Sequence, residues 1–452
     1  MAMKTKKMSV WLSENSDAIS KEIAAVSQVS ALTAAQNILC EADGSVRRIT
    51  VENLIEAIKT DQLDLSLVAW GVPIKQNQDS QSWGRIGNLT LWEEYKRSIG
   101  RYLVKTGGEK MAKLSASDSS IFADGTTVDE SKGDVFVVAP RLYFVVKYDA
   151  SLGCDVVWMS QKPIGGYYIE HPMIGAYMGC VEGGALHSRS SKNIYTTSDK
   201  TIRDFWNAAR ANGNDYGITC YEHGQWGMMA NLSEYGNPNV QANIGNGIGG
   251  EGEWGDNWSE ASQLKTGATI SLGDNCGSIP ITLTNAPNAC RVSLFGIEDW
   301  YNWQWEYRQG IYFGSSNNSG QTGLETFIYE GNRLPTDSEL TSHPTGTYRT
   351  IQRQGSSETW VAKMTIGEYF DLIPSEGGGG SNSRWGDKYW CYDSNSKPTG
   401  QLCVCGGSSD FQSRGGLGCV SSHDAFGYRW PNLGARLAYY GALPKIVNGA
   451  DL

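Results

Sequence analysis

The chain has 452 residues, which predicts two or three domains rather than one. Asp and Glu total 48 against 38 for Lys and Arg, so the formal net charge is −10 at pH 7. Because proteins that bind a phosphate backbone concentrate positive charge, and no basic run occurs here, the composition argues against nucleic-acid binding.

No apolar stretch is long enough to cross a bilayer, and the early positive cluster at the N-terminus is not followed by an apolar segment. We therefore expect neither membrane insertion nor a secretory signal. The ten cysteines are scattered too widely for a disulfide scaffold, and most are expected to be buried thiols. These features predict synthesis and folding in a reducing cytoplasm, wherever the protein finally acts.

Residues 1–62 are predicted to form a helical module. Apolar residues recur at three- and four-residue steps from Ser16 to about Leu39, a tight turn at Asp43 leads into a strand, and a helix restarts over Thr50–Ile58. So short a module has too little core to stand alone. Its apolar stripe is covered either by self-association, by docking on another protein, or by its own chain.

Residues 63–165 change to a pattern of strands and loops. Val135–Val146 is β-branched and aromatic enough for a buried strand, in which Pro140 indicates a bulge or a break. Trp92–Gly100 predicts a short helix. The Gly165–Gly166 pair is a natural hinge, so we expect a β-rich middle domain that ends there.

Residues 166–452 combine helices with strands. Helices are predicted at Thr201–Ala211 and Glu222–Tyr235, each followed by a glycine that stops it. Around them the sequence alternates between short strands and turns, with long loops at Gly245–Cys290 and Gly314–Arg349. The predicted fold class is therefore α+β.

The run from Cys403 to Gly441 is rich in glycine and aromatic residues. Its closing segment, Asn432–Gly441, predicts a buried strand because Leu433, Leu437 and Tyr439 alternate. The stretch before that segment has no periodicity and mixes the polar and aromatic side chains that make binding surfaces. A framed, irregular loop of this composition indicates recognition rather than catalysis.

Four segments in one order carry a family likeness: Tyr235–Gly245, Phe295–Glu306, Gly406–Ser408 and Asn432–Gly441. Together they resemble the C-type-lectin-fold domains of phage tail fibres and of the variable proteins made by diversity-generating retroelements. Those domains are related in fold to the formylglycine-generating enzyme group. The likeness covers roughly Gly166 to Pro444, and Trp83–Lys96 looks like the upstream part of the same fibre proteins. The ordered set is fairly specific, whereas each part alone is a weak signal.

The resemblance implies a rigid scaffold that displays a diversified loop, since substitutions in the variable-protein family fall between the Gly-Gly-Ser segment and the closing strand. We call this stretch, residues 409–430, the loop window. Exposed loop positions change at small cost in stability, whereas a packed strand does not. We expect most of its aromatic residues to be exposed, with Trp430 the most buried of them. The expected ligand-binding residues are Ser409, Asp410, Phe411, Gln412, Ser413, Arg414, Ser421, Ser422, His423, Asp424, Phe426, Tyr428, Arg429 and Trp430.

An enzyme is the first rival interpretation. For the formylglycine-generating group the resemblance implies a copper-binding cysteine pair, and Cys403 and Cys405 would share one face of a strand. Nothing in the surrounding sequence completes a catalytic pocket, so we do not transfer that site. The five histidines show no ligand spacing, and His223 is expected to be a core residue. We therefore predict no enzymatic activity, no catalytic residue and no cofactor.

Metal binding and glycoside hydrolysis are two further rival interpretations. A zinc site built from Cys391, Cys403, Cys405 and Cys419 would lack the Cys-x-x-Cys knuckle, and no EF-hand-type loop is present. Glu298 and Asp299 resemble a paired-carboxylate glycosidase site. We expect them instead to belong to a core strand and turn whose tryptophans fill the interior. No metal ion is expected.

These observations predict an α+β protein with three parts: an N-terminal helical assembly or attachment module (1–62), a β-rich middle domain (63–165) and a C-type-lectin-like domain of the formylglycine-generating-enzyme-like subclass (166–452). The predicted function is a phage or prophage receptor-binding protein of the virion, at the tail or fibre tip, that is made in the host bacterial cytoplasm. Its expected partners are a bacterial cell-surface protein or glycan, other virion proteins through the N-terminal module, and further copies of itself, with a homotrimer favoured. Two competing functions are a structural virion component that uses the lectin-like domain for assembly only, and an oxidoreductase like the formylglycine-generating enzymes. A further alternative is an ordinary tail-fibre lectin domain whose loop is fixed and not diversified.

Overall fold

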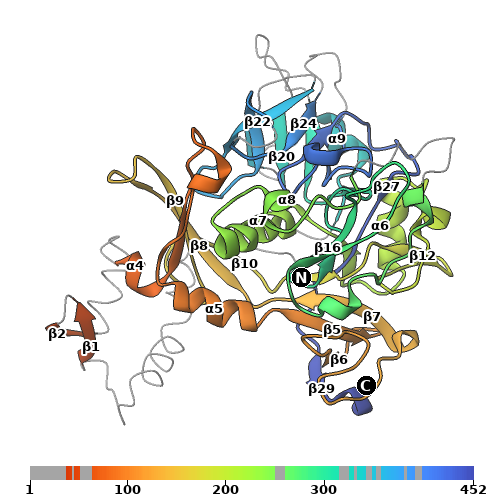
Figure 1. Cartoon of the computed structure of the whole chain (residues 1–452), viewed down its shortest axis with the longest axis horizontal. Helices are drawn as coiled ribbons and strands as arrows, with labels where there is room; N and C mark the ends of the chain where they lie inside the picture. Colours follow the sequence, from red (N-terminus) through yellow and green to blue (C-terminus); the bar gives the residue numbers. More distant parts are fainter. Residues whose placement is uncertain are drawn as a thin grey trace.

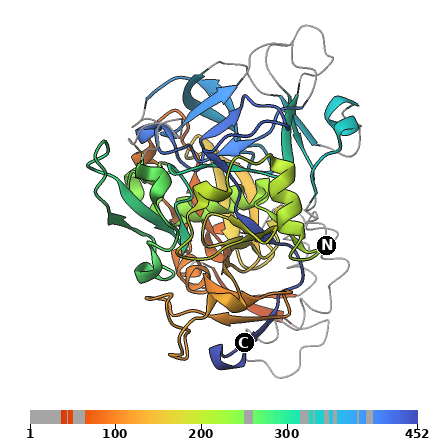
Figure 2. The ribbon, with the colours of Figure 1, turned by 90° about the vertical axis from the view of Figure 1, so that its right-hand side faces the viewer.

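The computed structural model describes residues 37–42, 45–50, 64–249, 260–314, 325–329, 333–342, 349–352, 358–380, 384–391 and 400–452. These residues combine helices with a larger number of strands, which confirms the α+β class. Helix α7 (Tyr221–Tyr235) lies near the middle of the molecule, with sheets on either side of it (Figure 1). The view turned by 90° shows the same layering (Figure 2). None of the helices in the described ranges is both long and apolar enough to cross a membrane.

A five-stranded sheet is built from the predicted middle region and one strand beyond its end, Tyr167–Ile169. Helix α5 (Leu89–Arg97) packs beside it and buries Trp92 and Tyr95, which confirms the helix predicted there. The Tyr95 hydroxyl accepts a hydrogen bond from the indole nitrogen of Trp226 on α7 at 2.9 Å, so α5 is tied to the central helix. In spatial order the strands are β10 (Tyr167–Ile169), β8 (Leu142–Asp149), β9 (Cys154–Ser160), β3 (Trp70–Pro73) and β4 (Ile86–Gly87).

The apolar run around Pro140 forms two strands rather than one. Strand β7 (Gly133–Val138) ends before the proline, and β8 begins two residues after it. The two strands belong to different sheets. Because proline cannot donate a ladder hydrogen bond, it marks a break here, not a bulge.

A seven-stranded sheet joins the segments on both sides of the predicted boundary at residue 165. The boundary itself is a turn in which Gly165 and Gly166 have φ values of 89° and 74°. Strands from before and after this turn pair directly, as β7 does with β11 (Met173–Gly175), so backbone hydrogen bonding is continuous across it. The division into domains therefore stays a prediction. In spatial order the strands are β14 (Tyr216–Ile218), β28 (Leu437–Tyr439), β11 (Met173–Gly175), β7 (Gly133–Val138), β5 (Gly100–Lys105), β6 (Lys110–Lys113) and β29 (Lys445–Val447).

A second seven-stranded sheet carries the loop window. In spatial order it contains β23 (Ile373–Gly377), β22 (Glu358–Thr365), β24 (Lys388–Cys391), β26 (Val420–Ser422), β25 (Val404–Cys405), β18 (Trp305–Tyr307) and β27 (Leu433–Gly434). The described residues also contain smaller sheets. They are formed by β15 (Gly277–Pro280), β16 (Cys290–Leu294) and β17 (Ile297–Glu298), by β19 (Ile311–Gly314), β20 (Glu325–Ile328) and β21 (Arg349–Gln352), and by β12 (Cys180–Glu182) with β13 (Ala185–His187).

The two helices predicted in the C-terminal part are confirmed. Helix α6 (Ile202–Arg210) begins at Thr201, whose hydroxyl forms a reciprocal capping box with Asp204. Helix α7 ends at Gly236, where a φ of 60° suits glycine. The remaining short helices are α4 (Leu65–Val68), α8 (Val240–Asn243) and α9 (Asp337–Ser342), with 3-10 turns at Ser80–Ser82, Glu130–Lys132, Ile194–Thr197, Glu260–Gln263, Ile270–Leu272, Gln412–Arg414 and Gly449–Asp451.

The N-terminal prediction is wrong at one of the two segments where it can be compared. Residues 37–39, expected to end a helix, begin strand β1 (Asn37–Ala42). This strand pairs with β2 (Ser45–Thr50) residue for residue, and hairpin pairing therefore overrides the helical spacing. Strand β2 itself was predicted and is confirmed. The rest of the predicted helical module, residues 16–36 and 51–58, lies outside the described residues.

The closing segment Asn432–Gly441 is buried, as predicted, but it is not one strand. Strand β27 runs parallel to β18, whereas β28 pairs with β11 and β14 in the other large sheet. Between them the fully buried guanidinium of Arg436 approaches a carboxylate oxygen of Glu306 to 3.4 Å and donates to the carbonyl oxygens of Gly175 and Glu298 at 3.1 and 2.9 Å. The predicted strand is divided because the chain passes from one large sheet to the other at this point, where the buried Arg436 lies.

Candidate functional site

The loop window starts where the chain leaves β25 and turns through Gly406 and Gly407, both with positive φ. It then forms a 3-10 turn at Gln412–Arg414 and a short strand, β26, before it returns to β27. Strand β26 pairs with both β24 and β25 in the interior of the sheet. The window is therefore not wholly irregular: its middle is fixed by strand pairing, and the segments on either side of it are loops.

Half of the predicted binding residues line one open cavity of about 230 Å³, which we call the aromatic pocket. From the window it is lined by Asp410, Phe411, Ser421, His423, Asp424, Tyr428 and Trp430. The neighbouring strands and the end of the loop contribute Trp305, Trp390, Val404, Asn432 and Leu433.

Three rings form the base of the aromatic pocket. Phe411 packs edge-on against Trp305 and Trp390, with ring centroids 4.9 and 4.7 Å apart, and the two tryptophans meet each other at 5.7 Å. Trp305 is buried, and the other two rings are half-buried. This mutual edge-to-face packing fixes the base of the pocket.

Two further rings stand at the rim. Tyr428 is 40% exposed and Trp430 is 42% exposed. The expectation that Trp430 would be the most buried aromatic residue of the window is therefore wrong. Phe426 takes that place at 6% exposure, because it packs against the ring of Tyr312 and beneath the Arg203 guanidinium.

Arg414, predicted as a binding residue, braces the loop beside the aromatic pocket. Its guanidinium lies 4.9 Å from the centroid of the Phe411 ring and donates to the carbonyl oxygens of Asp410 and Phe411 at 2.9 and 3.1 Å. The Asp410 carboxylate accepts a hydrogen bond from the Ser408 hydroxyl. These contacts hold the turn that presents Asp410 and Phe411.

The remaining predicted residues do not line the aromatic pocket. Ser409, Ser422 and Phe426 are buried, Ser413 is exposed, and the Gln412 side chain lies outside the description. The exposed Arg429 guanidinium is 3.9 Å from Asp199. The structure thus separates the window into a part that faces the pocket and a part that supports or surrounds it.

A buried carboxyl group lies beneath the window. Asp387 is 1% exposed, and its Oδ2 accepts a hydrogen bond from the backbone N–H of Gly418 at 2.8 Å. Burial raises the pKa of this carboxyl from 3.8 to about 8. Asp387 is therefore mostly protonated at neutral pH and supports the loop as a neutral group.

The Cys403–Cys405 pair adjoins a different and smaller cavity. The two sulfur atoms are 3.7 Å apart and line a space of about 30 Å³ together with Arg308, Tyr221 and Gln225. A hydrogen bond with Cys403 and the nearby Arg308 guanidinium lower the pKa of the Cys405 thiol. The cavity has room for about one water molecule. Arg308 is a neighbour that the sequence did not reveal.

Across the described residues, no group of three or more His, Cys, Asp or Glu side chains is placed to hold a metal ion. The cysteines whose side chains are described are free thiols, most of them buried, as expected. His223 is fully buried on α7, with its ring stacked on Tyr440. Burial lowers the pKa of His223 to about 3, so it is a neutral core residue, which confirms the prediction.

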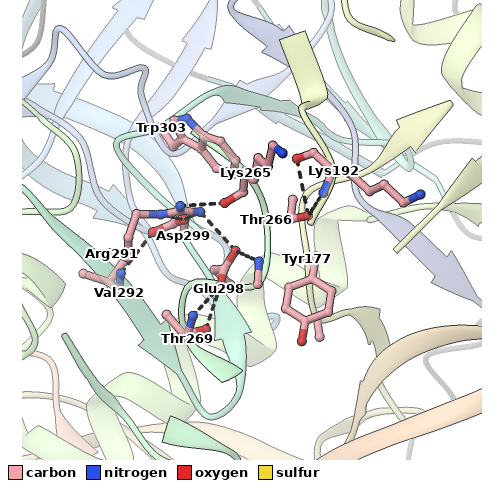
Figure 3. A network of polar contacts seen from close by, with 12 residues as sticks. Tyr177, Lys192, Lys265, Thr266, Thr269, Arg291, Val292, Glu298, Asp299 and Trp303 are labelled. Carbon is pink, nitrogen blue, oxygen red and sulfur yellow. Dashed lines mark hydrogen bonds and ion pairs between the residues drawn. The ribbon is translucent and has the colours of Figure 1, made fainter. Parts of the chain in front are cut away.

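Glu298 and Asp299 belong to a buried ionic cluster (Figure 3). The Arg291 guanidinium contacts Glu298 at 3.0 Å and Asp299 at 2.5 Å, and it lies 4.4 Å from the centroid of the Trp303 ring. Glu298 also accepts hydrogen bonds from the backbone and hydroxyl of Thr269. All three charged side chains are at most 2% exposed. The prediction that Glu298 and Asp299 belong to a core strand and turn is confirmed.

A larger open cavity, of about 640 Å³, lies between residues 119–131 and 189–192. Its two cations are already paired within the protein. Arg189 lies 3.6 Å from Asp134, and Lys192 donates to Glu182 at 2.8 Å. Because the positive charges of Arg189 and Lys192 are already balanced by these carboxylates, the larger cavity has little positive charge to offer an anionic ligand. The aromatic pocket is therefore the stronger candidate site.

Sequence reasoning missed two rings of the aromatic pocket. The sequence analysis placed Trp305 in the core rather than at a binding site. No local sequence pattern identifies Trp390 as a pocket residue. Both come from strands outside the window, and Trp390 arrives because β24 pairs with β26 in a register that places it opposite Ser421. A pairing between strands so distant in the chain leaves no local signal to detect.

No model of a known protein family matches this chain, and no curated protein matches it. Its function is therefore inferred from the residues that line the aromatic pocket.

Proposed function

We propose that this chain is a receptor-binding protein of a phage or prophage, and that the aromatic pocket contacts a protein or glycan on the bacterial surface. The proposal includes a C-type-lectin-like fold for residues 166–452. One observation carries it: the loop window expected to bind ligand gathers half of its predicted residues around a single open pocket with two exposed rings at the rim.

The arrangement of the aromatic pocket suits recognition. Its base is made of rings that pack on one another, so little conformational entropy remains to be lost there on binding. Tyr428 and Trp430 at the rim offer large contact areas with few rotatable bonds. A fixed base beneath adaptable rim positions is the combination that a displayed binding loop requires.

The proposed mechanism is binding without chemistry. The N-terminal module would attach the chain to other virion proteins at the tail or fibre tip, and a homo-oligomer, with a trimer favoured, would present several pockets at once. Linked pockets raise a weak single-site affinity through effective concentration, by about 10² to 10⁴. Attachment would then depend on the rim residues of every copy.

The test is cell attachment by the double variant Tyr428→Ala, Trp430→Ala. Fluorescently labelled full-length protein is applied to a panel of bacterial strains, and a strain that retains the wild type is used for comparison. We expect attachment to fall at least about tenfold, because rim aromatics are typical binding hot spots. The free energy of unfolding should change by less than about 1 kcal/mol, since both rings are partly exposed.

The matched control is Tyr148→Ala. Tyr148 is 68% exposed on β8, in a different sheet from the loop window, and its loss should leave attachment unchanged. A wild type that attaches to none of the strains, or a double variant that attaches as well as the wild type, would contradict the proposal. Hydroxyl-radical footprinting that finds both rim rings protected in the free assembled particle would instead assign the pocket to virion assembly.

A further inference from the structure

We infer that Cys403 and Cys405 form a peroxide-reactive dithiol, in which Cys405 attacks the small oxidant and Cys403 then closes a disulfide with it. The inference goes beyond the proposed function and does not depend on it, because it concerns the cavity of about 30 Å³ beside β25 rather than the aromatic pocket. Three features carry it: the closeness of the two sulfur atoms, a buried guanidinium beside them, and a small cavity that both thiols line.

The pairing of β18 with β25 brings the reacting groups together. Glu306 lies opposite Cys405 in this register. Two residues further along, the backbone N–H of Arg308 donates to the carbonyl oxygen of Cys403 at 3.0 Å. Because side chains two residues apart share a face of a sheet, the two thiols lie on the same side of β25. Val404 faces the other way and lines the aromatic pocket, so the dithiol and that pocket are separate sites.

The first feature is the geometry of the sulfur atoms. They lie 3.7 Å apart and share a hydrogen bond. A disulfide bond is about 2.0 Å long, so an approach of less than about 2 Å closes it. Cys405 is half-buried, whereas Cys403 is only 2% exposed. The sulfur of Cys405 is therefore the one that an oxidant meets, and the sulfur of Cys403 is placed behind it to resolve the product.

The second feature is the Arg308 guanidinium, which is buried and lines the same cavity as both thiols. A guanidinium keeps its charge when it is buried, so it stabilises a thiolate beside it. The Glu306 carboxylate acts in the opposite direction, but it is held between Arg308 and Arg436 at 3.0 and 3.4 Å. The hydrogen bond with Cys403 and the nearby cation together lower the pKa of the Cys405 thiol.

Cys405 differs in this respect from six other described cysteines. Burial raises the pKa of each of them: Cys154, Cys180, Cys220, Cys276, Cys290 and Cys419. Cys154 is the most useful comparison, because it is also half-buried but lies on β9 in another sheet. Exposure alone therefore does not distinguish Cys405, whereas its neighbours do.

The third feature, the cavity, limits the size of the oxidant. A space with room for about one water molecule suits hydrogen peroxide, which is only slightly larger, and excludes peroxides with bulky substituents. Much of its wall is apolar and is formed by Ile311, Leu372, Ile373, Leu417 and Val420. Such a wall directs a small polar oxidant to the thiols and the guanidinium.

The proposed oxidation has two steps. The Cys405 thiolate attacks one oxygen of hydrogen peroxide, the O–O bond breaks, and the sulfur becomes a sulfenic acid, while the departing hydroxide takes a proton from solvent and becomes water. The Cys403 sulfur then attacks the Cys405 sulfur, the S–O bond breaks, and a second water leaves with the Cys403 proton. The dithiol loses two electrons and one peroxide gains them. An added dithiol reductant reverses the change.

The test compares the cysteines of the reduced, full-length wild type in one experiment. The protein is treated with one equivalent of hydrogen peroxide, the remaining thiols are alkylated, and the peptides are identified by mass spectrometry. The peptide that contains both Cys403 and Cys405 should lose two hydrogen atoms, at least about tenfold faster than the Cys154 peptide is oxidised. Dithiothreitol should restore both thiols. Cumene hydroperoxide, which is too bulky for the cavity, should oxidise the pair at least about tenfold more slowly.

Two variants separate the roles of the sulfur atoms. Cys405→Ser should leave Cys403 reduced, whereas Cys403→Ser should hold Cys405 as a sulfenic acid that dimedone traps. The matched control, Cys154→Ser, should react as the wild type does. The comparison of cysteines within the wild type needs no variant, so it tests the inference even if a serine at either position destabilises the fold.

The results that would overturn the inference are distinct from those that bear on receptor binding. Oxidation of the pair no faster than that of Cys154, or equal rates with the two peroxides, overturns the assignment of a peroxide site to this cavity. Oxidation of Cys405 to a sulfinic acid without a disulfide overturns the resolving role of Cys403. Cell attachment by the rim variant tests the receptor-binding function separately, and neither result decides the other.

Discussion

Two regions of this molecule place carboxylates beside tryptophan rings, and they differ in how far they are closed to solvent. In the buried cluster, Arg291 lies over Trp303 and pairs with Glu298 and Asp299. In the aromatic pocket, the rings and two aspartates line an open cavity. We expect the closed cluster to stabilise the fold, and we propose the open pocket as the recognition site.

The surroundings of the two regions support this distinction. The buried cluster is almost completely excluded from solvent, and backbone N–H groups of Gly267 and Thr269 donate to the oxygen atoms of Glu298. At the aromatic pocket, two rings remain about two-fifths exposed. Substitutions in the first region should therefore change folding, and substitutions at the rim of the second should change binding.

The largest effect is expected from Arg291→Met, which leaves two buried carboxylates without their cation. Removing one partner of a buried ion pair typically costs about 3 to 5 kcal/mol, because the remaining charge is uncompensated. Urea unfolding measures this loss. The control Arg429→Met removes an exposed guanidinium at the edge of the loop window and should cost less than about 0.5 kcal/mol. Equal losses in the two variants would refute the contrast between the regions.

The second prediction concerns the protonated carboxyl beneath the loop window. The pKa of Asp387 is about 8 in the folded protein and near 3.8 in the unfolded chain. Between these values the folded state holds the additional proton, so stability should fall as pH rises. A one-proton difference corresponds to at most about 1.4 kcal/mol per pH unit, or about 2.7 kcal/mol between about pH 5 and pH 7.

Asp387→Asn isolates this contribution because an amide cannot titrate. Its urea-unfolding free energy should fall less steeply over the same pH range than that of the wild type. The titratable neighbours Cys419 and Tyr301 stay neutral in this range, since burial raises the pKa of each well above its ordinary value. Identical slopes for variant and wild type would show that Asp387 is ionised in the folded protein.

The sequence predicted the parts of the fold that depend on local signals. Helix α6, the glycine that ends α7 and the interruption at Pro140, predicted as a bulge or a break, each involve residues within a few positions of one another. Strand β1, its pairing with the predicted strand β2, and the division of the closing strand were missed. All three depend on which segment pairs with which, and helical spacing or alternation within one segment contains no information about its partner.

The site was predicted in part for the same reason. The loop window was located from composition and from its resemblance to a known family, and half of its predicted residues line the aromatic pocket. Trp390 reaches the pocket only through the pairing of β24 with β26. The exposures of Phe426 and Trp430 were reversed because burial depends on contacts with Tyr312 and Arg203, which come from distant strands and helices.

The smallest effect, and the closest comparison, comes from two glycines of the same window. A Cβ at Gly416 would lie 2.0 Å from Oδ1 of Asp387, whereas a Cβ at Gly427 would meet no atom within 4 Å. Asp387 cannot swing away at low cost, because it is buried and accepts a hydrogen bond from Gly418. Gly416→Ala should therefore destabilise the protein by about 1 to 3 kcal/mol, as overpacking does.

Gly427→Ala should leave the melting temperature unchanged or slightly higher, because it only reduces the freedom of the unfolded chain. Thermal unfolding distinguishes the two variants, and cell attachment of the folded proteins adds the functional readout. If Asp387 positions the loop beneath the aromatic pocket, Gly416→Ala will weaken attachment as well as stability, and Gly427→Ala will weaken neither. If Gly416→Ala lowers stability but leaves attachment intact, then the rim holds its binding geometry independently of its support, and the loop window is less tightly coupled to the sheet than its contacts with Asp387 indicate.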